Sequence, residues 1–143
     1  AGADLMRFEL ATPTRMLVSA EAEEVVAPGV EGYFGVLPGH AAFLTTLAPG
    51  EVMYRTGQRQ EYLAVAGGFA EVRAERVIIL AEHAERPEEI DRERAERARQ
   101  RAEMRLQGRS PTGEPEEIDF ARALEALARA LTRLLVIGRA QSQ

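Results

Sequence analysis

The amino-acid sequence predicts an α+β protein in which an N-terminal β-sandwich is followed by a C-terminal antiparallel two-helix hairpin. Short apolar runs separated by turn dipeptides fill the first part of the chain, which is typical of a sandwich or barrel. A charged, alanine-rich run without glycine follows, and after it comes a run with an apolar stripe at helical spacing. We therefore divide the chain into a sandwich domain, residues 1–86, and a helical hairpin, residues 87–143.

The predicted strands are short runs rich in β-branched and aromatic residues, with turn-prone dipeptides between many of them. These runs are MRFEL, RMLVS, EEVVA, YFGVL, EVMYR, EYLAV, GFAEV and VIILA. The dipeptides are Thr12-Pro13, Pro28-Gly29, Pro38-Gly39, Pro49-Gly50 and Gly67-Gly68. A segment of about 80 residues is just long enough to enclose a core of this kind.

The first predicted helix begins at Pro87 and ends before Gly108. Proline is well suited to the first helical position, and acidic residues in the first turn complement the helix dipole. The acidic residues here are Glu88, Glu89 and Asp91. Its apolar side chains are mainly those of Ala95, Ala98 and Ala102. Because alanine buries little area, we expect this helix to dock weakly.

Arginine dominates the charge of this helix, and the whole chain has 18 basic residues, none of them lysine. Between residues 92 and 106 there are six arginines and three glutamates, so this segment has a net charge of about +3. One interpretation is a solvated face with i,i+4 pairs such as Glu93–Arg97 and Arg99–Glu103. The other is a face that meets a polyanion or an acidic partner. Both remain open at this stage.

The second predicted helix covers residues 118–137, after a loop at residues 108–117 that contains two glycines and two prolines. Its large apolar residues fall on one stripe: Phe120, Leu124, Leu127, Leu131, Leu134 and Leu135. Arg122, Arg129 and Arg133 fall on the opposite side. By spacing alone, we expect that arginine side to be exposed to solvent.

Composition excludes several classes of function. The net charge of −5 argues against general nucleic-acid binding, and the absence of cysteine excludes thiolate catalysis and cysteine-based zinc sites. His40 and His83 share no metal-binding or catalytic motif, and a phosphate-binding P-loop needs a lysine. No apolar run is long enough to span a membrane. We therefore expect no catalytic or metal site and no insertion into a membrane.

Three stretches resemble a known family: EGYFGVLPGHAAFLTTLAPGEV at residues 31–52, AVAGGFAEV at 64–72 and IDFARALEALARALTRL at 118–134. They are similar to the epsilon subunit of the bacterial F-type ATP synthase, whose mitochondrial counterpart is the delta subunit. The resemblance implies a sandwich of about ten strands followed by two helices. It also implies a non-catalytic rotor subunit of a proton-translocating enzyme, peripheral at the cytoplasmic face of the bacterial plasma membrane.

The same resemblance implies the partners and the regulatory role. In the family, the sandwich binds the gamma subunit and the ring of c subunits. The hairpin, when extended, meets the alpha and beta subunits and inhibits ATP hydrolysis. The residues that correspond to the family's c-ring contact are Glu31, Tyr33 and His40. Tyr33 occupies a position that is often glutamate in bacterial relatives, so we expect a packing contact there rather than a charged one.

The segment IDRERA, residues 90–95, resembles a motif that belongs to an ATP site in some bacterial epsilon subunits. No cofactor is required, and ATP is the regulatory ligand that the resemblance implies. The corresponding candidates are Glu85, Ile90, Asp91, Arg94, Ala95, Arg101, Arg129 and Arg133. Arginine suits phosphate because its guanidinium group makes bidentate hydrogen bonds. An independent nucleotide-sensing module remains the alternative function, and an enzyme is a distant third.

Overall fold

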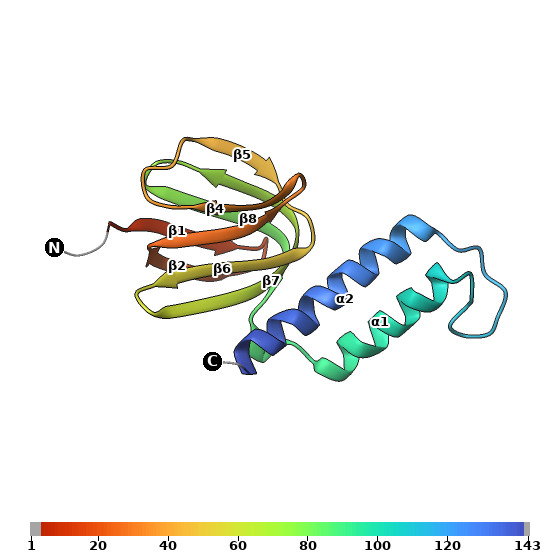
Figure 1. Cartoon of the computed structure of the whole chain (residues 1–143). Helices are drawn as coiled ribbons and strands as arrows, with labels where there is room; N and C mark the ends of the chain where they lie inside the picture. Colours follow the sequence, from red (N-terminus) through yellow and green to blue (C-terminus); the bar gives the residue numbers. More distant parts are fainter. Residues whose placement is uncertain (1–3, 142–143) are drawn as a thin grey trace.

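The computed structural model of the chain describes residues 4–141, which form a β-sheet domain and a helical hairpin beside it (Figure 1). The strands are β1 Met6–Ala11, β2 Met16–Ala22, β3 Glu24–Gly29, β4 Gly32–Val36, β5 Phe43–Thr46, β6 Gly50–Thr56, β7 Arg59–Val72 and β8 Arg76–Glu85. A short 3₁₀ helix, η1 (Pro87–Glu89), leads into α1 (Arg92–Leu106) and α2 (Phe120–Gln141). The predicted fold class, a sandwich followed by two helices, is confirmed.

The strands join in one hydrogen-bonded sheet in the order β2-β1-β8-β7-β6-β3-β4, and β5 pairs with β7 beside this path. Strands β1 and β8 run parallel, whereas the other pairs are antiparallel. The sheet folds into a sandwich around a single core (Figure 1). Within the described residues there are eight strands, where the family resemblance implied about ten.

Strand β7 changes partners at a pair of glycines. Its first half pairs with β6 and its second half with β5, while β8 follows it along the other edge. Gly67 and Gly68, which lie at this change, have φ angles of 72° and 107°. The prediction of two separate strands, EYLAV and GFAEV, was therefore wrong: the glycines bend one long strand instead of ending it.

The sequence patterns did not predict β5, whose segment FLTT is short and lies between two Pro-Gly turns. It forms because its backbone pairs with β7, from Phe43 opposite Val72 to Thr46 opposite Phe69. A strand of four residues gives too little alternation to be recognised without its partner.

Alternation of apolar and polar residues builds the core. In β1, Met6, Phe8 and Leu10 are fully buried between exposed or half-buried neighbours. In β8, Val77 and Ile79 point inward in the same way. The remaining core residues come from both layers and include Val25, Val36, Val52 and Val72. A sheet with one face buried is expected to show this period of two.

Helix α1 begins later than Pro87, the start that the sequence predicted. Pro87 opens η1 instead, and Ile90 is extended, with φ −85° and ψ 126°. Asp91 then caps α1, because its Oδ1 accepts a hydrogen bond from the backbone N–H of Arg94 at 3.1 Å. The acidic residues predicted for a first helical turn thus belong to a turn and a cap.

The hairpin lies to one side of the sandwich, with α2 between α1 and the strands (Figure 1). The loop that joins the helices contains Gly108 and Gly113 with positive φ angles, as a turn at residues 108–117 requires. Strands β6 and β7 are the parts of the sandwich on which α2 packs. The main contact of the hairpin with the sandwich is therefore made by its second helix.

Candidate functional site

The hinge between sandwich and hairpin is fixed by Glu89 of η1. Its carboxylate accepts two hydrogen bonds from the Arg15 guanidinium, at 2.5 and 3.0 Å, and a third from the backbone N–H of Arg86 at 2.8 Å. The bonds from Arg15, and then the one from Arg86, lower the pKa of Glu89 from 4.5 to about 2. Arg86 also donates to the carbonyl oxygen of Leu17 at 2.8 Å. The segment that leads into α1 is thereby tied to the sandwich.

The segment IDRERA has structural roles at several of its positions. Asp91 caps α1, and Ala95 is only 2% exposed. Ile90 is half-buried, whereas Arg94 is exposed. The helix cap at Asp91 and the buried Ala95 explain two positions of the motif without a ligand. The exposed Arg94 is therefore the position of the motif at which binding of a ligand would matter most.

Alanines lie where the two helices meet. The buried residues of α1 are Ala95 and Ala102, and they face the buried Ala123 and Ala130 of α2. Small side chains let the helix axes approach closely, but they bury little apolar area. The helices are therefore close together without a large hydrophobic contribution.

The arginine side of α2 borders a groove that consists of one cavity between α2 and α1 and of others between α2 and the sandwich. Arg129 and Arg133 line each of three adjoining cavities, the two larger of which have volumes of about 630 and 670 Å³. The walls are Ala98, Arg101, Ala102 and Arg105 on the α1 side, and Leu47, Pro49, Ala66, Gly67 and His83 on the sandwich side. The prediction that this arginine side faces solvent holds for Arg122, which is exposed, but was wrong for Arg129 and Arg133, which are half-buried in the groove.

Some of the ATP candidates come together in this groove. Glu85, Arg129 and Arg133 line the smallest cavity, where Arg133 Nε donates to Glu85 Oε1 at 2.5 Å. Arg101 lines the neighbouring cavity with Arg129 and Arg133. The other candidates, Ile90, Asp91, Arg94 and Ala95, do not line these three cavities.

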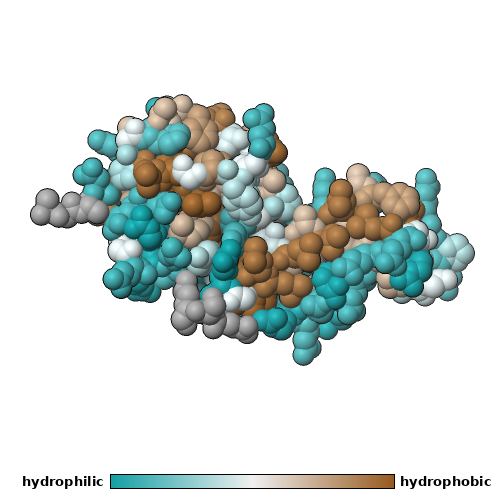
Figure 2. All heavy atoms as spheres, viewed as in Figure 1, coloured by the Kyte–Doolittle hydropathy of each residue, from teal (hydrophilic) through white to brown (hydrophobic). Residues whose placement is uncertain are grey.

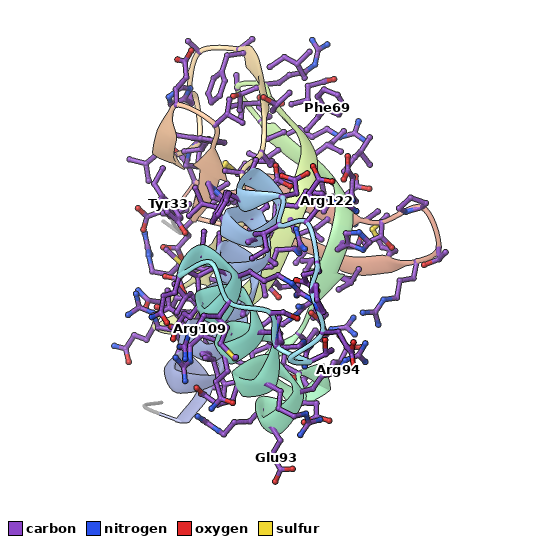
Figure 3. The ribbon with its side chains drawn as sticks, turned by 90° about the vertical axis from the view of Figure 1, so that its right-hand side faces the viewer. Tyr33, Phe69, Glu93, Arg94, Arg109 and Arg122 are labelled. Carbon is purple, nitrogen blue, oxygen red and sulfur yellow. The ribbon has the colours of Figure 1, made fainter. Side chains whose placement is uncertain are left out.

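Arg94 lies outside the three cavities, on the exposed surface of α1. Figure 3 shows Arg94 and Arg122 on the same side of the hairpin, and Arg122 lines the groove. Glu93 points away into solvent at the far edge of α1 (Figure 3), with a side chain 89% exposed.

Other charges of α1 pair with one another. Arg99 donates to Glu103 at 2.8 Å and also bonds Glu96, and Arg97 lies 4.0 Å from Glu93. The predicted i,i+4 pairs Glu93–Arg97 and Arg99–Glu103 are therefore confirmed. This part of the arginine excess forms a solvated, internally paired face.

The leucine stripe of α2 is on the surface. Phe120, Leu124, Leu131 and Leu135 are 47–60% exposed, whereas Leu127 and Leu134 are half-buried. Figure 2 shows the stripe as a continuous hydrophobic band along α2. The stripe exists as the spacing predicts, but most of its side chains remain exposed instead of packing within the hairpin. It is the largest apolar feature of the hairpin that another molecule would meet.

The three candidates for the c-ring contact do not form one cluster. Glu31 and Tyr33 are exposed at the start of β4, and the Tyr33 hydroxyl accepts a hydrogen bond from the Glu51 N–H at 3.0 Å. His40 lies beyond the other end of β4, where its ring packs on Phe43 with centroids 5.4 Å apart. A single contact would have to extend along β4 to include all three.

Two features are absent from the described residues 4–141. These residues contain no group of three or more histidine, cysteine or acidic side chains arranged to hold a metal ion. No helix among them is long and apolar enough to cross a membrane.

Comparison with known proteins shows which family has this architecture. A family model for the β-sandwich domain of the ATP synthase delta/epsilon chain matches residues 5–87. A second model, for the long α-helix domain of the same chain, matches residues 88–138. The chain belongs to the ATP synthase delta/epsilon family.

Relatives in this family match over nearly the whole length. The ATP synthase epsilon chain of Moorella thermoacetica is 49% identical over 134 residues, which cover 93% of this chain and 96% of that one. The epsilon chain of Geobacter metallireducens is 44% identical over 138 residues, covering 96% and 97%. The epsilon chain of Koribacter versatilis is 51% identical over 109 residues, covering 76% and 77%.

Two solved structures contain a chain with the same fold. A chain in the structure of the Euglena gracilis mitochondrial ATP synthase, OSCP/F1/c-ring, superimposes with a TM-score of 0.76 at 24% identity. It covers all of this chain and 85% of its own length. A chain of the Tetrahymena thermophila mitochondrial ATP synthase central stalk and c-ring gives a TM-score of 0.56 at 17% identity, covering 97% and 98%.

Sequence reasoning missed the residues that hold this delta/epsilon hairpin on its sandwich. Arg15 and Glu89 pair across the hinge, and Arg139 pairs with Glu51 at the far end of α2. Glu51 belongs to the stretch that carried the family resemblance, but the sequence does not say that its partner lies 88 residues away. Long-range pairs of this kind have no signal in spacing.

Proposed function

We propose that the chain is a non-catalytic subunit of the central stalk of a proton-translocating ATP synthase. The observation that carries the proposal is the match of both family domains, in order, to residues 5–138, together with relatives named ATP synthase epsilon chain. The related structures are parts of assemblies described as F1/c-ring and central stalk/c-ring. The subunit would be peripheral, at the cytoplasmic face of the bacterial membrane.

Within this proposal, the two parts of the chain have different tasks. The sandwich, residues 1–86, binds the gamma subunit and the c ring, with Glu31, Tyr33 and His40 as candidates for the ring contact. The hairpin, residues 87–143, leaves the sandwich, extends toward the alpha and beta subunits and slows ATP hydrolysis. The exposed leucine stripe supports this second task, because it leaves the large apolar side chains of α2 available to partners.

ATP is the regulatory ligand in the proposal, and the groove supports it. Arg101, Arg129 and Arg133 bring guanidinium groups that suit phosphate to the groove, and alanines beside them leave room. Acidic side chains, among them Asp119 and Glu125, line the same cavity and offset part of this positive charge. The cavity against α1 and the cavity against the sandwich share Arg129 and Arg133, so a nucleotide bound at these two arginines that reached into both cavities would favour the folded hairpin. It shifts the balance only by its difference in affinity for the folded and extended states.

The test is to delete residues 87–143 and to reconstitute the enzyme with the remaining sandwich. We expect assembly with gamma and the c ring to persist and ATP hydrolysis to rise. A full-length chain, reconstituted in parallel, is the control. If the truncated enzyme assembled normally and hydrolysed ATP at the full-length rate at low and high ATP, the inhibitory task would be wrong. Failure of the folded sandwich to bind gamma would contradict the stalk assignment itself.

A further inference from the structure

The contact of α2 with the sandwich contains few large apolar side chains. Val136 is fully buried and Thr132 is 8% exposed, and Thr132 satisfies its hydroxyl by donating to the Ala128 carbonyl at 2.8 Å. Leu131 and Leu135, between and beside them, are each 47% exposed. Leu127, Leu134 and Ile137 are only half-buried, so Val136 is the one large apolar side chain of this 22-residue helix that is fully buried, and the apolar area is modest. Other interactions must contribute to holding the hairpin in place.

The end of α2 carries such an interaction. Arg139 donates to both carboxylate oxygens of Glu51, with Nη2–Oε1 at 3.0 Å and Nε–Oε2 at 3.3 Å. The Glu51 side chain is only 13% exposed, and the Arg139 guanidinium lies 5.4 Å from the centre of the Tyr62 ring. A two-pronged ion pair with one partner mostly shielded is stronger than an isolated surface pair. Stacking on the ring adds a cation–π contribution.

The backbone of Glu51 is held in place by contacts that do not involve Arg139. Its backbone N–H donates to the Tyr33 hydroxyl at 3.0 Å. The preceding Gly50 is packed so tightly that a Cβ there would lie 2.6 Å from Tyr33 Oη and from Pro28 Cβ. Because the Glu51 backbone is fixed by its neighbours, only its side chain has to be ordered on the sandwich side when the pair forms.

A second ion pair, Arg133 with Glu85, lies nearer the hinge, but it borders the arginine groove. An anion bound in the groove would compete with Glu85 for Arg133. The Glu51–Arg139 pair is outside the three cavities that form the groove. It is therefore independent of the nucleotide candidates.

We propose that Glu51, Arg139 and Tyr62 form an ionic latch that closes the C-terminal end of α2 onto the sandwich. The latch acts on the isolated chain, whatever the hairpin does in a complex. Its regulatory consequence rests on the proposed function: the latch sets how readily the hairpin leaves the sandwich. Because it is ionic and lies near the surface, rising salt weakens it.

The test measures hydrogen–deuterium exchange of the full-length chain, by mass spectrometry, at the amides of residues 130–138. Arg139→Gln and Glu51→Gln should each speed this exchange about five- to tenfold. This change lies between the effect expected from losing an exposed ion pair and the effect expected from losing a charge-assisted hydrogen bond. The matched control is Arg73→Gln, which removes a 2.7 Å pair with Glu71 within the sandwich and should leave α2 unchanged. The proposal is overturned if the amides of α2 exchange no faster in the two latch variants than in the control.

Two further measurements identify the pair itself. The swapped variant Glu51→Arg/Arg139→Glu should recover most of the protection that either single change to glutamine loses. Raising potassium chloride from 50 to 500 mM should speed exchange more in the wild type than in Glu51→Gln/Arg139→Gln. Loosening by the single variants without recovery in the swap, or an equal effect of salt on both proteins, overturns the latch. No ATPase measurement enters, so these outcomes are separate from the failure of the proposed inhibitory role.

Discussion

At the scale of single residues, the absence of lysine decides how this chain makes its ion pairs. A guanidinium group can meet both oxygens of a carboxylate, and Arg15 with Glu89 and Arg139 with Glu51 do so across sequence separations of 74 and 88 residues. Both pairs join the sandwich to the hinge or to the hairpin. Arginine therefore contributes to the placement of the hairpin as well as to its charge.

Glu89 yields a prediction about pH. Its pKa is lowered on folding, so the folded state binds this proton more weakly than the unfolded state. The stabilisation is complete above the unfolded value of 4.5 and is lost as pH falls toward about 2. Glu89→Gln should lower the free energy of unfolding by about 1 kcal/mol at pH 7, since solvent screens part of the pair. Urea unfolding at pH 7, 5, 4 and 3 measures it.

The difference between wild type and Glu89→Gln should shrink steadily between pH 5 and pH 3. Glu88→Gln, an exposed neighbour in η1, is the control and should change stability little at any pH. A difference that stays constant across the acid range would mean that Glu89 acts through packing and not through its charge.

Arg94 and Arg99 give a prediction about nucleotide binding. Arg94 is exposed on the groove side of the hairpin, whereas Arg99 is already bonded to Glu96 and Glu103. If ATP binds, Arg94→Ala should weaken it by about 1.5–3 kcal/mol, the contribution of a charge-assisted hydrogen bond. Arg99→Ala should weaken it much less. Isothermal titration calorimetry compares the two, and equal losses would mean nonspecific attraction to positive charge.

At the scale of elements, the sequence predicted the fold class, most of the strands and both helices. The predictions failed where the pairing of strands or the orientation of a helix decides the structure. The sequence missed β5, whose four residues need β7 beside them, and it cut β7 in two at Gly67-Gly68. It placed the leucines of α2 on one stripe correctly, but spacing does not say which stripe turns inward. Close contact through Ala123 and Ala130 decided that question.

The sequence also predicted local features of the candidate site, but not the tertiary contacts that those features make. The arginines of α2 share a side, as their spacing predicts, but only the tertiary structure reveals that this side borders the groove. Glu51 was inside the most recognisable stretch of the chain, yet its role depends on Arg139 at the other end of the sequence. Motifs identified the family, and contacts between distant residues fix the junction.

The bend in β7 can be tested with two glycines. A Cβ at Gly68 would lie 2.0 Å from the Leu80 carbonyl oxygen, and its φ of 107° is unfavourable for any other residue. Gly68→Ala should therefore cost at least about 2–3 kcal/mol of stability. Gly138 of α2 has nothing within 4 Å of its Cβ position, and Gly138→Ala should add up to about 1 kcal/mol through helix propensity.

Urea unfolding of both variants gives the comparison. The two variants should change the free energy of unfolding in opposite directions, because the backbone at Gly68 requires glycine whereas Gly138 only weakens its helix. A Gly68→Ala variant as stable as the wild type would show that the sandwich can shift its strands to accept a side chain. The bend would then not depend on glycine.

At the scale of the whole molecule, the hairpin is joined to the sandwich by small side chains and ion pairs, while its largest apolar surface faces outward. A contact of this composition contributes only a few kcal/mol. Under the proposed function, partners of an extended hairpin would supply energy of that size, so two arrangements of the hairpin would interconvert. The exposed leucine stripe offers them a surface without first breaking the core of the sandwich.

Locking the folded arrangement gives the final prediction. The chain contains no cysteine, so an engineered pair across the contact of α2 with β7 can form only the intended disulfide within it. In the reconstituted enzyme, the oxidised lock should raise ATP hydrolysis, because a hairpin held on the sandwich cannot extend to inhibit. Reduction with dithiothreitol should restore the slower rate in the same sample, which removes differences in assembly as a cause. Oxidised and reduced enzymes of equal activity, at low and at high ATP, would mean that the extended hairpin is not the inhibitory state. The weak docking of α2 would then have to serve assembly of the stalk instead of control of its rotation.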